Sequence, residues 1–116
     1  DYTLDPGQTL TLTLYWQAED ASATPYAVSA QLLDASGALR AQCDQQPGGG
    51  DFPTTGWVAG EVLTDTYRVE LPAGLSPGTY TLILKMYDPA TGDVLPATGA
   101  DGSVDEMLSL TQVEIR

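Results

Sequence analysis

Hydrophobic and polar residues alternate along much of this chain with the period of two that is typical of half-buried β-strands. The clearest run is TLTLTLYW at residues 9–16, where leucine or tryptophan fills every second position and threonine or tyrosine the positions between. Threonine favours strands, and Pro6 and Gly7 directly precede the run, so we predict a strand there and not a helix.

Similar patterns predict six further strands, and no segment shows the 3.6-residue period of an amphipathic helix. The predicted strands span about residues 26–33, 39–44, 61–71, 80–87, 94–95 and 107–115. Turn sequences DASG (34–37) and DPATGD (88–93) predict two hairpins, and residues 97–105 are predicted to form a polar loop. Short strands separated by turns predict an all-β fold, an antiparallel β-sandwich of about seven to eight strands.

Two positions break the alternation. Asp65 falls on the apolar face of its strand, which indicates an edge position or a bulge. In the last strand the apolar phase changes between Leu110 and Val113, which predicts a bulge near Thr111.

The segment LSPGTYTL at residues 75–82 resembles the tyrosine corner of immunoglobulin-like and fibronectin type III domains. Tyr80 stands where the corner tyrosine would be, and the resemblance implies that its hydroxyl bonds to the preceding backbone. Leu82 stands at the place of the second immunoglobulin cysteine, so the fibronectin-like version fits better. By the same resemblance, Trp16 would pack between the sheets. Few residues precede its strand, which implies a first strand that is short, missing or merged.

Over nearly the whole chain, PGQTLTLTLYWQA, LLDASGALRAQ and LSPGTYTLILKMYDPATGDVLP together resemble β-sandwich modules of bacterial multi-spanning membrane glycosyltransferase-type proteins, which carry them outside the membrane. The resemblance implies an extracytoplasmic location in the cell envelope, tethered through a larger protein. It brings no catalytic residue of such enzymes into this segment.

Length and charge narrow the possible functions. The 116 residues, 42% of them hydrophobic, suit a single domain over 1–116, and because the chain opens at Asp1 instead of methionine we expect it to be excised from a longer protein. Sixteen acidic and four basic residues give a net charge of −12, which argues against nucleic-acid partners and anionic membrane surfaces. No apolar run reaches the length of a membrane helix, so we expect no direct membrane insertion by this segment.

Residues that commonly carry catalysis are scarce. The sequence has no histidine, which removes the usual general base and the commonest metal ligand. Cys43 is the sole cysteine, so neither an internal disulfide nor a thiolate zinc cluster can form. We therefore predict a protein that is not an enzyme and has no cofactor.

Acidic residues at turns offer weak candidates for calcium ligands. Asp88 with Asp93, and Asp101 with Asp105, could supply oxygen ligands at loop tips. Neither pair follows the spaced Asp/Asn series of a known calcium loop, and aspartate at such positions commonly bonds the turn backbone. We prefer the turn role.

The loop QQPGGGDFPTTGWVAG (45–60) holds the candidate ligand-binding residues Asp51, Phe52 and Trp57. Aromatic side chains in such a loop could form a sugar-stacking platform. Alternatively, Trp57 folds back as a plug over one end of the sandwich, which is the interpretation that we favour. Tyr15 and Tyr87 could form a small exposed contact patch if they are neighbours.

These observations lead to a functional hypothesis with one alternative. We expect a non-catalytic extracytoplasmic module that acts as a spacer or protein-interaction domain of a larger bacterial envelope protein. Its partners would be other domains of the same polypeptide or envelope proteins. The alternative is a carbohydrate-binding module that uses the loop aromatics to bind glycans.

Overall fold

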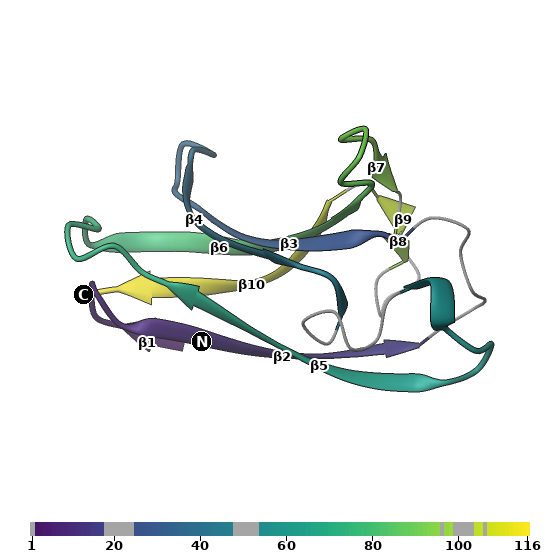
Figure 1. Cartoon of the computed structure of the whole chain (residues 1–116). Helices are drawn as coiled ribbons and strands as arrows, with labels where there is room; N and C mark the ends of the chain where they lie inside the picture. Colours follow the sequence, from purple (N-terminus) through teal and green to yellow (C-terminus); the bar gives the residue numbers. More distant parts are fainter. Residues whose placement is uncertain (1, 18–24, 48–53, 96, 99–103, 106) are drawn as a thin grey trace.

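In a computed structural model the chain folds into strands joined by turns (Figure 1). The structure describes residues 2–17, 25–47, 54–95, 97–98, 104–105 and 107–116. Ten strands and the short 3-10 helix η2 (Thr54–Gly56) lie within these residues. The strands are β1 (Tyr2–Leu4), β2 (Thr9–Gln17), β3 (Ala27–Leu33), β4 (Leu39–Gln45), β5 (Val62–Glu70), β6 (Gly78–Tyr87), β7 (Val94–Leu95), β8 (Ala97–Thr98), β9 (Val104–Asp105) and β10 (Leu108–Ile115).

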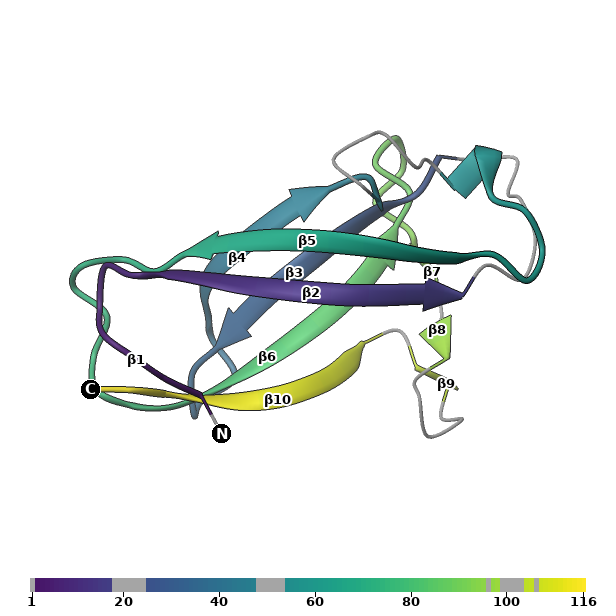
Figure 2. The same ribbon diagram turned by 90° about the horizontal axis from the view of Figure 1, so that it is seen from below.

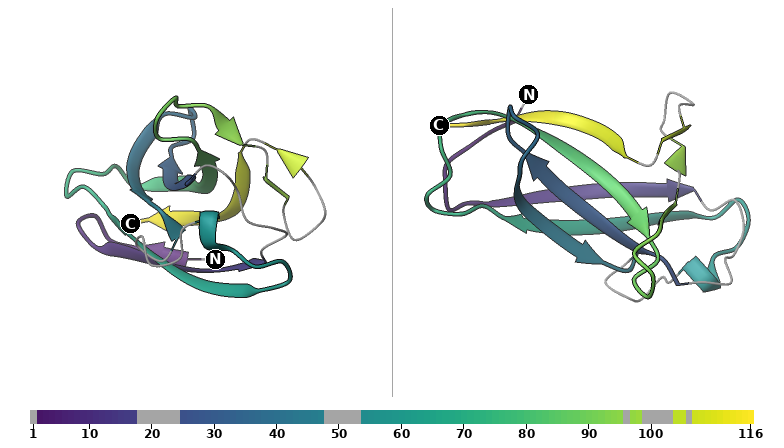
Figure 3. Two further views of the ribbon diagram at one scale, coloured as in Figure 1. Left: turned by 45° about the vertical axis from the view of Figure 1, so that its right-hand side comes forward. Right: turned by 90° about the horizontal axis from the view of Figure 1, so that it is seen from above.

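The strands form two facing layers, which confirms the predicted all-β, sandwich-like fold. The larger sheet has the order β1-β10-β6-β3-β4, with β7 added at the end of β6. The smaller sheet is the long antiparallel pair β2-β5, which crosses the face of the larger sheet (Figures 2 and 3). Alternate residues of both sheets point into the space between the layers and form one core.

The sheets are mixed, so the prediction of a purely antiparallel arrangement is wrong at one pair. Strand β1 runs parallel to β10, with Tyr2 opposite Val113 and Leu4 opposite Ile115. The turn at residues 5–8 explains this pairing, because it carries the chain from the edge of the larger sheet into β2 of the smaller one. The first strand is accordingly short.

The predicted loop at 97–105 also differs from the structure. Two-residue strands β8 and β9 pair there, with Ala97 opposite Asp105 and Thr98 opposite Val104. Such short strands show no alternation, so the sequence pattern could not reveal them.

The two departures from alternation have the expected origins. The register of β10 against β6 shifts between Ser109 and Thr111, which confirms the bulge. Asp65 lies in β5, which pairs with β2 alone among the described residues and keeps a regular register throughout. Asp65 therefore occupies an edge strand without a bulge.

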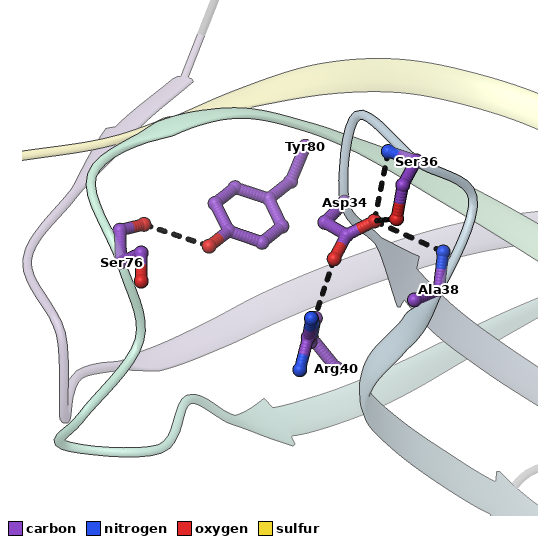
Figure 4. A network of polar contacts seen from close by, with 6 residues as sticks. All are labelled: Asp34, Ser36, Ala38, Arg40, Ser76 and Tyr80. Atoms are coloured by element: carbon purple, nitrogen blue, oxygen red, sulfur yellow. Dashed lines mark hydrogen bonds and ion pairs between the residues drawn. The ribbon is translucent and has the colours of Figure 1, made fainter.

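Tyr80 makes the hydrogen bond expected of a tyrosine corner. Its hydroxyl donates to the backbone carbonyl of Ser76 at 2.7 Å, while its ring is buried in the core (Figure 4). This bond ties the turn before β6 to the strand that follows it.

The β3-β4 turn shows why aspartate is placed there. Asp34 accepts hydrogen bonds from the hydroxyl and backbone N–H of Ser36 and from the backbone N–H of Ala38, and it forms a 2.7 Å ion pair with Arg40 (Figure 4). The Ser36 hydroxyl, followed by the Arg40 guanidinium and the Ala38 amide, holds the pKa of Asp34 well below its usual range. Gly37 takes the positive φ of 85° that this turn requires.

Replacing Tyr80 with phenylalanine tests the corner. We expect Tyr80→Phe to lower the free energy of unfolding by about 1 kcal/mol, because one hydrogen bond is lost while the buried ring stays in place. Urea unfolding measures the change. Tyr15→Phe is the matched control, since Tyr15 is 73% exposed and its loss of a hydroxyl should change stability by less than about 0.5 kcal/mol. Equal effects of the two substitutions would contradict the role assigned to the corner.

Candidate functional site

Two tryptophans meet at one end of the sandwich. Trp57 follows η2 directly and packs against Trp16 of β2, with ring centroids 6.2 Å apart and planes tilted by 40°. Both rings are half-buried and lie against the core. Trp16 thus lies at the end of the core and not at its centre. The geometry agrees with the plug interpretation of Trp57.

A local anchor holds Trp57 in this place. Thr54 is buried, and its side-chain oxygen accepts a hydrogen bond from the backbone N–H of Tyr26 at 3.0 Å. The N–H of Trp57 donates to the Thr54 carbonyl at 3.3 Å, which closes the turn of η2. The turn therefore fixes Trp57 relative to the start of β3.

A buried carboxylate, that of Asp65, bonds to Trp16 of this pair. Asp65 is only 2% exposed, and one of its oxygens accepts hydrogen bonds from the Tyr67 hydroxyl at 2.5 Å and from the Trp16 indole N–H at 3.2 Å. The amide of Gln45 donates to the other oxygen at 3.4 Å and also to the Thr66 carbonyl at 3.1 Å. Three side chains from three strands therefore satisfy this carboxylate.

Burial also affects the pKa of the Tyr67 hydroxyl. Desolvation, and then the hydrogen bond to the Asp65 carboxylate, raise the pKa of Tyr67 far above its usual value near 10. The hydroxyl consequently stays protonated and keeps its donor role. An arrangement of this kind holds strands together, because both polar groups are shielded from solvent and directed at each other.

The sequence contains one signal for this cluster, although no candidate site predicted from it includes Asp65. Asp65 stands on the apolar face of its strand, and a buried carboxylate requires hydrogen-bond donors. Its donors Trp16 and Gln45 lie 49 and 20 residues away in the chain, so spacing alone could not identify them.

Of the predicted ligand-binding residues, the structure describes Trp57. Asp51 and Phe52 lie outside the described residues, so their position beside Trp57 stays a prediction. Val58, next to Trp57, is 64% exposed, which adds an apolar side chain to the outer surface of this end.

The candidate calcium residues are only partly described. Asp88 accepts a hydrogen bond from the backbone N–H of Ala90 at 2.9 Å, and its own N–H donates to the Asp93 carbonyl at 2.8 Å. These bonds shape the β6-β7 turn, as expected for aspartate in a turn. Asp101 lies outside the described residues, and for Asp105 the structure describes only the backbone. Among the described side chains, no group of three or more potential metal ligands is found.

Tyr15 and Tyr87 do not form one patch. Tyr15 lies on the outer face of the smaller sheet, whereas Tyr87 belongs to β6 of the larger sheet and its hydroxyl donates to Asp44 at 2.8 Å. Cys43 is a free, half-buried thiol that packs against the core.

The surface of the described part of the molecule is hollowed in places away from Trp57. One hollow, of about 510 Å³, lies between the β3-β4 turn and the corner before β6, where Arg40 and Tyr80 contribute to its lining. Another, of about 550 Å³, lies between β2 and β10. Neither includes Trp57.

Comparisons with protein-family models, curated proteins and solved structures found no match to this chain. Within the described residues no helix is long and apolar enough to cross a membrane.

Removing the buried carboxylate should destabilise the fold strongly. We expect Asp65→Ala to lower the free energy of unfolding by about 2–4 kcal/mol, because the Tyr67 hydroxyl and the Trp16 indole lose their acceptor in a buried environment. Urea unfolding followed by tryptophan fluorescence measures the loss. Asp93→Ala, which removes an exposed carboxylate, serves as the control and should cost less than about 0.5 kcal/mol. A loss below about 1 kcal/mol for Asp65→Ala would contradict the structural role of the cluster.

Proposed function

We propose that this chain is a non-catalytic module that acts as a spacer or protein-interaction domain of a larger bacterial envelope protein, outside the cytoplasm. The observation that carries the proposal is that side chains able to take part in catalysis or binding form hydrogen bonds within the fold instead. The Asp65 carboxylate accepts hydrogen bonds from the Tyr67 hydroxyl and the Trp16 indole. The carboxylates of Asp34 and Asp88 accept hydrogen bonds from the backbone of their own turns. These groups support a scaffold and not a reaction centre.

Strands β1 and β10 are tied together at one end of the sandwich. The N–H of Arg116 donates to the carbonyl of Leu4 at 3.1 Å, so β1 and the end of β10 lie side by side at the end opposite η2 (Figure 2).

Two features support the proposed setting. The tyrosine-corner bond between Tyr80 and Ser76 is the feature that immunoglobulin-like and fibronectin-like modules share, and such modules commonly serve as surface domains. The net charge of −12 suits a solvated surface that repels other copies. A glycosyltransferase-type parent protein remains part of the proposal, on the sequence resemblance alone.

Heating the isolated chain tests whether it is an autonomous module with a fixed cap, by which we mean the turn η2 and the packed pair Trp16 and Trp57. Because Trp16 and Trp57 are the two tryptophans of the chain and both lie in the cap, fluorescence reports on the cap while far-ultraviolet circular dichroism reports on the strands. We expect both signals to change in one coincident transition. A cap that melts well before the strands, or a chain without a cooperative transition, would contradict the proposal.

Binding of glycans is the second candidate function. The specific observation that favours it is the half-buried Trp57, which leaves part of its side chain exposed next to the exposed Val58. Aromatic faces of this kind stack on the apolar faces of sugars, and Asp51 and Phe52 would add to the same surface.

Fluorescence titration separates the two functions. We expect no saturable change when oligomers of N-acetylglucosamine or of mannose are added to millimolar concentration, since the packing of Trp57 on Trp16 leaves only part of the ring for stacking. A saturable change that Trp57→Phe weakens would establish the glycan function instead. In that variant Trp16 still reports on the cap, and Tyr15→Phe provides the control for an unrelated exposed aromatic residue.

A further inference from the structure

The two long sides of the sandwich differ in how the sheets meet. On one side, Gln45 of β4 reaches across to Asp65 and Thr66 of β5. On the other side, where Figure 2 shows β2 and β10 in different layers, residues of these two strands line a groove of about 550 Å³. Its lining is leucine, threonine and valine, from residues 10–14 of β2 together with Leu82, Leu110, Thr111 and Val113.

The β2 side of this groove is an unusually regular strand edge. Strand β2 pairs with β5 in unbroken register from Thr9 to Gln17 and, among the described residues, has no partner on its other side. Edge strands are normally blunted by charged residues, proline, bulges or short length. The nine residues TLTLTLYWQ contain none of these features, so the edge can accept a further strand through its backbone groups.

Strand β1 lies on the same side of the sandwich as the groove, where it pairs with β10 and not with β2. It runs beside residues Val113–Ile115 of β10, in the opening between β10 and β2, but it covers only that end (Figure 2). In the part of the chain that the structure describes, residues 108–111 of β10 have no strand on this side. The groove therefore continues the path of β1 past its three residues.

We propose that β2 and the groove beside it bind an extended strand from another polypeptide, which adds to the smaller sheet. Because successive side chains of a strand alternate between its faces, the bound strand would place apolar residues in the groove at every second position. Its outward positions would carry lysine or arginine, since the host chain has a net charge of −12. The same charge opposes a second copy of this chain as the occupant. The proposal rests on the interaction role proposed above and names the class of partner.

Two synthetic nine-residue peptides test this proposal on the full chain. The probe alternates lysine and valine (KVKVKVKVK), and the control has the same composition without alternation (KKKVVVVKK). Titration calorimetry at about 150 mM salt, where long-range charge attraction is screened, should show that the probe binds at least about tenfold more tightly. Amide hydrogen exchange should slow in β2 on binding of the probe, and should not slow in β4.

A pair of matched variants locates the binding. Leu110→Lys places a positive charge in the groove at a residue that is 38% exposed, and should weaken probe binding at least about tenfold. Leu39→Lys makes the same change at a residue of β4 that is 48% exposed and lies outside the groove, and should leave binding within about twofold of the parent chain.

Several results would overturn the proposal. These are equal affinity for the two peptides, no binding of either peptide, or equal effects of Leu110→Lys and Leu39→Lys. Sedimentation showing a dimer that Leu110→Lys dissociates would replace the proposed partner with a second copy of the chain. None of these outcomes changes the thermal-unfolding test of the module itself, so failure of this proposal and failure of the proposed function are distinguishable.

Discussion

Hydrogen bonding to the buried carboxylate of Asp65 is the interaction on which the arrangement of the two sheets depends. A charge out of water is tolerated only where donors replace its hydration, and here the donors come from β2, β4 and β5. The indole of Trp16 and the hydroxyl of Tyr67 fix the smaller sheet around the carboxylate. The Gln45 amide adds the edge strand of the larger sheet. One carboxylate thereby links β4 to β5.

The cluster also explains how the described residues close one side of the sandwich. Gln45 bonds to both Asp65 and the backbone of Thr66, which holds β4 against β5. On the opposite side, leucine and threonine of β2 face β10 across a groove. The short β1 fills one end of that side because the turn into β2 leaves it only three residues of pairing with β10. The two sides therefore differ: hydrogen bonds join β4 to β5, whereas apolar side chains of β2 and β10 line a groove.

Local features of the fold could be predicted from the sequence, because their causes lie within a few residues. The Asp34 turn and the Tyr80 corner depend on partners two to six positions away, and the bulge in β10 follows from a change of phase within the strand. The parallel β1 could not be predicted, since three residues show no period. The cap could be predicted only in part: Trp57 was expected to fold back, but its contact with Trp16 and the donors to Asp65 come from distant segments that only the folded chain brings together.

The acidic surface and the regular β2 edge are related physically. A strand without charge, proline or bulge is normally a site of aggregation, because identical edges pair with each other. In this chain the net charge of −12 repels any other copy of the same chain. The charge of the whole molecule, and not the residues of β2, thus opposes pairing between two β2 edges. Protection of that kind is selective. It opposes acidic chains, including copies of this one, and it leaves the backbone groups of β2 open to a strand of opposite charge. A short or interrupted edge strand would exclude acidic and basic strands alike. A regular edge on an acidic molecule instead favours basic strands over acidic ones.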